Sequence, residues 1–304
     1  MAANDDTASM PFIKNLASSD RKLRDSALST LRAFLSNSQR RLSDTDNLKL
    51  WKGLFYSLWM CDRALPQQQL CGELAGLARA LPRAAAVPPW AAAFWATVAR
   101  EWTTGIDVLR MEKFLLLVRR VLAASLEWAL GGGPGGGKSG GTKKQGKGGE
   151  RNSSKKRTAA SGSGEEKNGE EEEEEPFDRA AAMLAVLADW PLERTGDLAK
   201  VPVGLRLHVL DIWVDEAEKL GLLGTDDDDD DDDGEQEEEE KEKKRQFLDR
   251  IRELVEAQTR SACKPVRARA RESLADERLP WNSRSETTKT TAGAPGDSWD
   301  GFED

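Results

Sequence analysis

Apolar residues recur every three or four positions along most of the first 130 residues of the chain. This spacing places them on one face of an α-helix and leaves the opposite face polar. Prolines and short polar stretches separate the segments and indicate where each helix starts or stops. The predicted helices cover residues 20–35, 50–63, 66–81, 88–102 and 107–130.

The segment richest in large side chains is residues 50–63. Trp51, Phe55 and Trp59 follow one another at one-turn intervals, so they share one stripe of the helix. Aromatic side chains of this size bury a large apolar area, and we expect all three in the core. By the same periodicity, Leu23 and Leu109 are expected to face inward in their helices.

Helical spacing returns after residue 177, and no stretch shows the alternation of a half-buried strand. Successive amphipathic helices with short connections favour antiparallel neighbours, which bury their apolar faces by stacking in pairs. We therefore predict an all-α fold, a HEAT/armadillo-like helical repeat solenoid without a strict repeat. The later helices are expected at residues 178–190, 203–223, 239–260 and 266–278.

Segments of biased composition, which cannot form a core, lie between the predicted helices. Such segments are rich in Gly and Lys or in Asp and Glu, which predicts disordered charged insertions. The expected order is a disordered N-terminus (1–10), N-terminal helical repeats (11–130), a Gly/Lys-rich and then acidic linker (131–176), continued repeats (177–224), an acidic insert (225–242), charged C-terminal helices (243–279) and a flexible tail (280–304).

Charge alternates in blocks along the chain, around a net charge of -9. Residues 131–160 carry 8 basic and 1 acidic side chains, whereas residues 225–242 carry 14 acidic and 1 basic. Such blocks are typical of proteins that contact basic proteins, nucleic acids or both. No apolar run reaches the length of a bilayer span, and residues 1–9 do not resemble a secretion signal. We expect a soluble intracellular protein with no membrane partner.

Residues 132–139 read Gly-Gly-Pro-Gly-Gly-Gly-Lys-Ser and match the phosphate-loop pattern of nucleotide-binding enzymes. That loop needs a strand before it and a helix after it, because the helix N-terminus helps to hold the phosphates. Here a predicted helix precedes the motif and more Gly, Lys and Ser follow it. A flexible linker is the favoured interpretation, and a nucleotide hydrolase is a distant alternative.

Other patterns that carry chemistry are not found in the sequence. His208 is the only histidine, and Cys61, Cys71 and Cys263 have no paired spacing, so we expect no zinc site, catalytic triad or disulfide framework. The acidic runs lack the alternating ligands and turn glycine of a calcium loop. We therefore expect no enzyme, no cofactor or metal, and no small-molecule substrate.

Charged residues outside the apolar stripes are candidate contacts for protein partners or RNA: Lys52, Asp62, Arg63, Lys113, Arg119 and Arg120. Helix-surface ion pairs are the alternative explanation. A second basic group has a bipartite spacing, two residues and then three after a gap of ten, which fits a nuclear import signal. Its members are Lys143, Lys144, Lys155, Lys156 and Arg157.

Three of the predicted helices carry motifs as well as periodicity. They are Leu-Trp-Lys-Gly-Leu-Phe-Tyr (50–56) with Trp-Met-Cys-Asp-Arg (59–63), Arg-Met-Glu-Lys-Phe-Leu-Leu-Leu-Val-Arg-Arg (110–120) and Asp-Ile-Trp-Val-Asp-Glu (211–216). In order and spacing, the chain resembles the ribosomal RNA processing protein 1 family, the Nop52-type nucleolar assembly factors.

This resemblance implies a non-catalytic factor of the nucleus and nucleolus, with an α-helical repeat fold. It also implies a role in precursors of the large (60S) ribosomal subunit, in processing of 27S pre-rRNA towards 25S/28S and 5.8S rRNA. The expected partners are other large-subunit assembly factors and ribosomal proteins, and pre-rRNA is a further candidate. The alternative is a direct RNA-binding or RNA-chaperone protein that relies on its basic segments.

Overall fold

The structure is a computed structural model, and it describes residues 10, 12–37, 41–132, 177–224 and 235–282. Within these ranges the chain forms α-helices and short 3-10 turns, without a β-strand. The helices are α1 (Ile13–Leu16), α2 (Arg21–Leu35), α3 (Asp44–Trp59), α4 (Ala64–Ala75), α5 (Val87–Glu101), α6 (Met111–Ala129), α7 (Arg179–Asp189), α8 (Val203–Lys219), α9 (Glu235–Gln258) and α10 (Lys264–Leu274).

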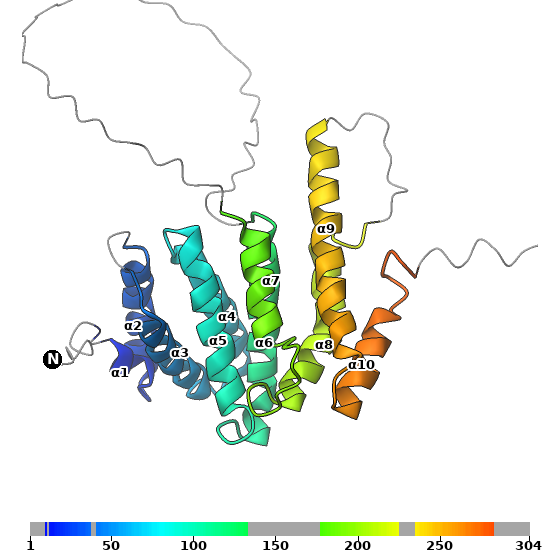
Figure 1. The fold of residues 1–304 in the computed structure, drawn as a ribbon. Helices are drawn as coiled ribbons and strands as arrows, with labels where there is room; N and C mark the ends of the chain where they lie inside the picture. Colours follow the sequence, from blue (N-terminus) through cyan, green and yellow to red (C-terminus); the bar gives the residue numbers. More distant parts are fainter. Residues whose placement is uncertain (1–9, 11, 38–40, 133–176, 225–234, 283–304) are drawn as a thin grey trace, which may run out of the picture.

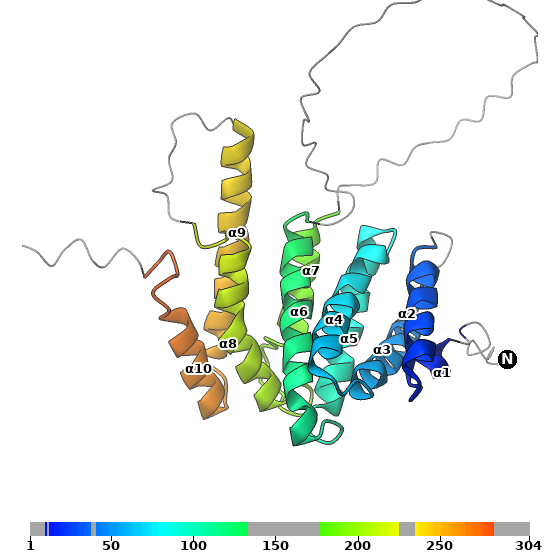
Figure 2. The ribbon, with the colours of Figure 1, turned by 180° about the vertical axis from the view of Figure 1, so that it is seen from behind.

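The helices stack in two layers that curve as a solenoid (Figures 1 and 2). One layer contains α3, α5, α7 and α9, and the other contains α2, α4, α6, α8 and α10. Because helices that follow each other in the chain alternate between the layers, each apolar face packs against the opposite layer. The predicted all-α helical repeat solenoid is confirmed.

Helix starts follow the capping residues of the sequence. Asp20 accepts a hydrogen bond from the backbone N–H of Lys22 at 2.8 Å and begins α2. Ser43 and Asp46 form a reciprocal capping box at the start of α3, which satisfies amide groups that have no partner inside the helix. Prolines in the first turn of α5 replace amides that would also lack such a partner.

Aromatic side chains join α3 to α5 in its own layer and to α6 in the other layer. The indole Nε1 of Trp51 donates to the carbonyl oxygen of Trp90 at 3.0 Å, and the two rings lie 5.0 Å apart. Trp51 also contacts Phe94 edge-on, while Phe55 stacks on Phe114 of α6 at 4.5 Å. Helix α3 therefore contributes aromatic contacts to both α5 and α6.

Three predicted core positions differ from the structure. Trp59 is only partly buried, at the C-terminal end of α3. Leu23 is 47% exposed because it lies in the first turn of α2, a helix at the edge of the solenoid. Leu109 is 90% exposed because Val108–Arg110 is a 3-10 turn, so α6 begins only at Met111 and the helical register does not extend back to Leu109.

Candidate macromolecular contact surface

Three of the predicted contact residues lie at the surface around the end of α3. Lys52 is exposed on its outer side, and Asp62 and Arg63 are exposed in the connection to α4. Gly53 lies beside Lys52 and faces α1, where an added Cβ would come within 3.2 Å of Leu16. Because Gly53 has no Cβ, α1 can pack closely on this side of α3, while Lys52 points into solvent.

The expectation that Lys113 is available at the surface is wrong. Its side chain is buried in α6, and its Nζ donates to the carbonyl oxygens of Trp59 at 2.8 Å and Cys61 at 2.9 Å. The carbonyl of Trp59 is at the C-terminal end of α3 and that of Cys61 lies two residues beyond it, so Lys113 caps this end of α3 from a neighbouring helix. Burial lowers the pKa of its amine, and the nearby carboxylate of Asp62, 3.8 Å away, acts in the opposite direction.

The neighbours Arg119 and Arg120 have different surroundings. Arg119 is half-buried and donates to Asp215 and Glu216 of α8, each at 2.6 Å. Burial opposes the charge of this guanidinium, but the two carboxylates prevail and raise its pKa. Arg120 is exposed, and within the described residues it has no ion-pair partner. Arg119 therefore joins two helices, and Arg120 is the free surface cation of the pair.

The predicted import residues Lys143, Lys144, Lys155, Lys156 and Arg157 lie outside the described residues. Their role stays a prediction.

Sequence analysis missed a buried polar cluster between α7, α8 and α9. Arg206 is fully buried and its Nη2 lies 2.8 Å from Oε2 of Glu193. The same guanidinium donates to the carbonyl oxygens of Glu193 and Val201, and Gln258 of α9 donates to the carbonyl of Leu192. The members of this cluster are far apart in the sequence, so no local pattern predicts it.

The carboxylate of Glu193 is held by several donors at once. It accepts from the backbone N–H groups of Thr195 at 2.5 Å, Gly196 at 2.9 Å and Asp197 at 3.0 Å, in addition to Arg206. Burial would raise its pKa, but these hydrogen bonds outweigh that effect and lower the pKa to about 2. Residues 193–197 are thereby fixed as a rigid loop between α7 and α8.

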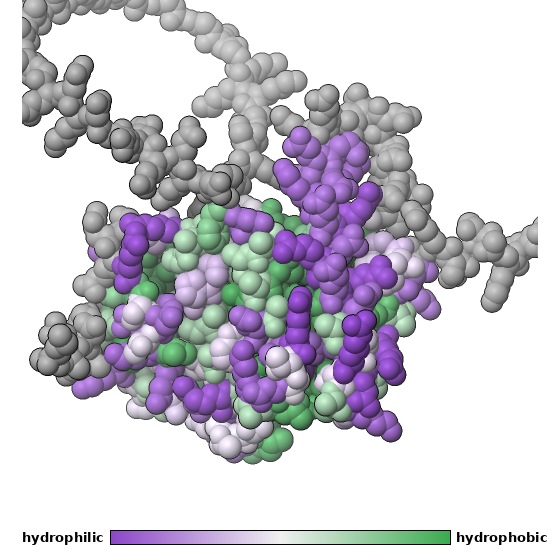
Figure 3. Space-filling model, viewed as in Figure 1, coloured by the Kyte–Doolittle hydropathy of each residue, from purple (hydrophilic) through white to green (hydrophobic). Residues whose placement is uncertain are grey.

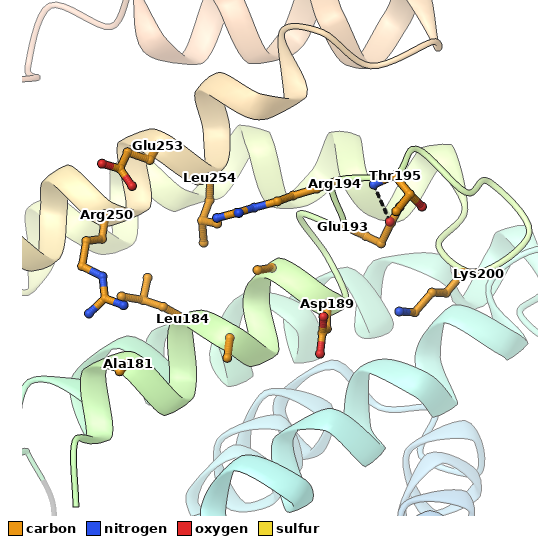
Figure 4. Close-up of a pocket in the computed structure, with 12 residues that line it drawn as sticks. Ala181, Leu184, Asp189, Glu193, Arg194, Thr195, Lys200, Arg250, Glu253 and Leu254 are labelled. Carbon is orange, nitrogen blue, oxygen red and sulfur yellow. Dashed lines mark hydrogen bonds between the residues drawn. The ribbon is translucent and has the colours of Figure 1, made fainter.

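A groove of about 510 Å³ lies beside this loop, between α7 and α9 (Figure 4). Small side chains of α7 line one side, among them Ala181, Ala185 and Ala188, and Leu254 of α9 lines the other. The space-filling view shows apolar surface over α5 and α7 next to the strongly hydrophilic surface of α9 (Figure 3). The groove lies at the boundary between these two kinds of surface.

The described residues show no clustered metal ligands. They contain no group of three or more His, Cys, Asp or Glu side chains that could hold a metal ion. Nε2 of His208 lies 3.0 Å from the carbonyl oxygen of Leu115 and joins α8 to α6, and burial lowers the pKa of the imidazole. None of the helices described has both the length and the apolar character needed to cross a bilayer.

A family model described as "Nucleolar protein, Nop52" matches residues 7–130 and 170–298. These two ranges cover well over half of the chain and contain all of its described helices. The chain belongs to the Nop52 family. The match includes the polar cluster around Arg206 as well as the aromatic helix α3, so both halves of the solenoid fall within the Nop52 pattern.

Individual relatives of this Nop52 chain are similar over a shorter range. Human ribosomal RNA processing protein 1 homolog B is 40% identical over 124 residues, which is 40% of this chain and 16% of that protein. Mouse homolog A is 42% identical over 118 residues, which is 38% of this chain and 24% of that protein. The Drosophila melanogaster homolog is 33% identical over 115 residues, which is 36% of this chain and 17% of that protein. The aligned segment is thus under a quarter of the length of each of these relatives.

Proposed function

We propose that this chain is a non-catalytic nucleolar factor for ribosomal RNA processing, acting as a helical scaffold in precursors of the large (60S) subunit. The observation that carries the proposal is the Nop52 match, which extends over both halves of the solenoid. In support, the relatives are named as ribosomal RNA processing proteins, and stacked helical pairs offer long surfaces for binding. The proposed step is maturation of 27S pre-rRNA towards 25S/28S and 5.8S rRNA.

The proposed partners are other large-subunit assembly factors, ribosomal proteins and pre-rRNA. For these contacts we propose Lys52, Asp62, Arg63 and Arg120, because all four side chains are exposed. Lys113 and Arg119 are left out, since their charged groups are held by α3 and α8. An exposed cation that has no ion-pair partner can bind a phosphate or carboxylate without breaking an existing ion pair.

Replacement of the endogenous protein by a variant tests this function. In cells whose own copy is depleted, the wild-type chain should co-sediment with large-subunit precursors and prevent 27S pre-rRNA from accumulating. The triple variant Lys52→Glu, Arg63→Glu and Arg120→Glu should fold normally but no longer co-sediment with the large-subunit precursors. The matched control reverses three exposed cations at the other end of the solenoid, Arg260, Lys264 and Arg271.

Two outcomes would contradict the proposal. Normal 27S processing after depletion would reject the function itself. Unaltered co-sedimentation of the triple variant would reject the assigned contact residues and leave the function standing.

A second candidate function is direct RNA binding by the N-terminal helices. It is favoured by the outer side of α3, where Lys52 and the partly exposed ring of Tyr56 lie one turn apart. A cation beside an aromatic ring suits a phosphate and a stacked base. Binding of naked pre-rRNA by the purified chain, falling steeply with salt, would favour this candidate over the scaffold.

A further inference from the structure

The groove between α7 and α9 is open because the side chains on its α7 side are small. Ala185 is exposed, Ala181 and Ala188 are half-buried, and the buried side chains of Leu184 and Leu254 form the apolar base. Helices with small side chains at a contact can approach each other to about 8 Å between their axes. The groove therefore offers a strip of small apolar side chains along α7, bordered by charged side chains, against which another helix can lie.

Two arginines lie on the inner side of this strip. Figure 4 shows the side chain of Arg194 beside Leu254 and the guanidinium of Arg250 beside Leu184. Both arginines are exposed, and neither forms an ion pair with any residue that the structure describes. The groove thus presents the positive charges of these two arginines beside its small apolar side chains, and Lys200 is a third cation in its lining.

The carboxylates around the groove do not neutralise these charges. Glu193 is already held by Arg206 and by three backbone N–H groups. Asp189 and Glu253 also line the groove, but Figure 4 shows both carboxylates directed away from the two guanidinium groups. The charge available to an occupant is therefore positive.

We propose that the α7–α9 groove binds an amphipathic, acidic helix of a partner protein. Its apolar stripe would pack on Ala181, Ala185 and Ala188, and its carboxylates would pair with Arg194 and Arg250. Such a helix matches the groove in both shape and charge, which is the usual basis for helix-in-groove recognition. The inference rests on the proposed scaffold role, because it names the class of partner that this part of the scaffold holds.

RNA fits the groove less well than an acidic helix does. The groove has an apolar base and no aromatic residue among those that line it, so a base has no stacking surface there. The neighbouring ring of Trp190 is covered by Lys200, whose Nζ lies 5.0 Å from the ring centroid.

Site-specific photocrosslinking in the full-length chain identifies the occupant. A benzophenone amino acid at position 185 should crosslink, within purified precursor particles, to a protein segment with helical apolar spacing and an excess of Asp and Glu. That segment, made as a synthetic peptide, should bind the purified wild-type chain. Crosslinks to RNA, to residues 165–176 of the same chain, to a segment without this pattern, or to nothing would each overturn the proposal.

Variants on both features of the groove complete the test. Ala185→Trp fills the groove and Arg194→Glu with Arg250→Glu reverses its charge, so each should weaken peptide binding at least tenfold. The controls are Ala268→Trp, an exposed alanine of α10, and Arg260→Glu with Arg271→Glu, which should change the affinity less than twofold. If Ala185→Trp shifts the thermal melt, the charge-reversed variant decides, and an unchanged affinity there overturns the proposal.

The two proposals fail in different ways. If the wild-type chain does not sediment with large-subunit precursors, the proposed function is wrong, and the crosslink at position 185 is then read in the complexes with which the tagged chain purifies, where the same acidic helical segment is expected. If the chain does sediment there but the groove variants bind the peptide as the wild type does, only the groove proposal is wrong.

Discussion

Arg206 and Glu193 illustrate how a buried ion pair fits into the apolar core of the solenoid. Burying two charges costs several kcal/mol each, unless their remaining donors and acceptors are also satisfied. Here the guanidinium donates to the backbone carbonyls of Glu193, Asp197 and Val201, and the carboxylate of Glu193 accepts from three backbone amides. The pair therefore fixes the loop between α7 and α8 as well as holding the two charges together.

The pKa of Glu193 predicts a specific acid sensitivity. Because its pKa is about 2 in the folded chain and 4.5 for an ordinary glutamate side chain, its charge stabilises the fold above pH 4.5, and this stabilisation is lost as the pH falls towards 2. The difference corresponds to about 3 kcal/mol. We expect the difference in free energy of unfolding between the wild type and Glu193→Gln, measured in urea, to decrease by about this amount from pH 7 to pH 2.

Glu253→Gln is the matched control, because Glu253 is an exposed carboxylate beside the same groove. Its free energy of unfolding should follow the wild type at every pH. A gap for Glu193→Gln that stays constant with pH would show that the ionised carboxylate does not stabilise the loop.

At the scale of elements, the contact between α6 and α8 joins the two parts of the solenoid across residues 133–176. The sequence identified both helices, and the family resemblance singled out motifs in each of them. Neither the sequence nor the resemblance showed that Arg119 and Asp215, 96 residues apart, face each other. Arg119 and Arg120 are adjacent in the same helix, and the local sequence does not distinguish their environments. Only the packing of α8 makes Arg119 an inter-helix contact and leaves Arg120 in solvent.

Truncating each arginine separately should reveal this difference. Arg119→Ala removes two short charge-assisted hydrogen bonds to α8 and should lower the free energy of unfolding by about 1 to 3 kcal/mol. Arg120→Ala removes an exposed side chain and should change it by less than about 0.5 kcal/mol. Equal effects in chemical denaturation would mean that the bridge to α8 contributes nothing measurable.

For the whole molecule, the described core is one cluster that includes helices from both sides of residues 133–176. Helices α6 and α7 pack against each other although this long segment separates them in the chain. By loop-closure entropy, shortening a connection to a quarter of its length favours folding by about 1 kcal/mol. We therefore expect the contact between the two halves of the core to persist when this segment is shortened.

Replacing residues 133–176 by an eleven-residue Gly/Ser linker should leave the fold intact. We expect a single cooperative unfolding transition and a free energy of unfolding equal to that of the full chain or about 1 kcal/mol higher. Chemical denaturation followed by tryptophan fluorescence measures both quantities. A variant that unfolds in two steps, or is clearly less stable, would show that these 44 residues contribute to the core.

The sequence was sufficient to predict the fold class and most helices, because the apolar stripes of α3, α5 and α6 are long and regular. It was less reliable at helix ends, where Leu109 and Trp59 lie, because a 3-10 turn or a chain reversal changes which way a side chain points. For the candidate surface it gave the exposed residues Lys52 and Arg63, but the groove between α7 and α9 depends on long-range packing that no local pattern encodes.

Lys113 also offers a chemical probe of the chain. An amine that is 4% exposed and bound to two carbonyls is shielded from acylating reagents until α6 separates from the end of α3. The amine of Lys52, which is exposed and lies about two turns before the end of α3, reacts in the folded state and provides an internal reference. The ratio of labelling at these two lysines, read by mass spectrometry inside a particle, would therefore report whether binding opens or tightens this junction.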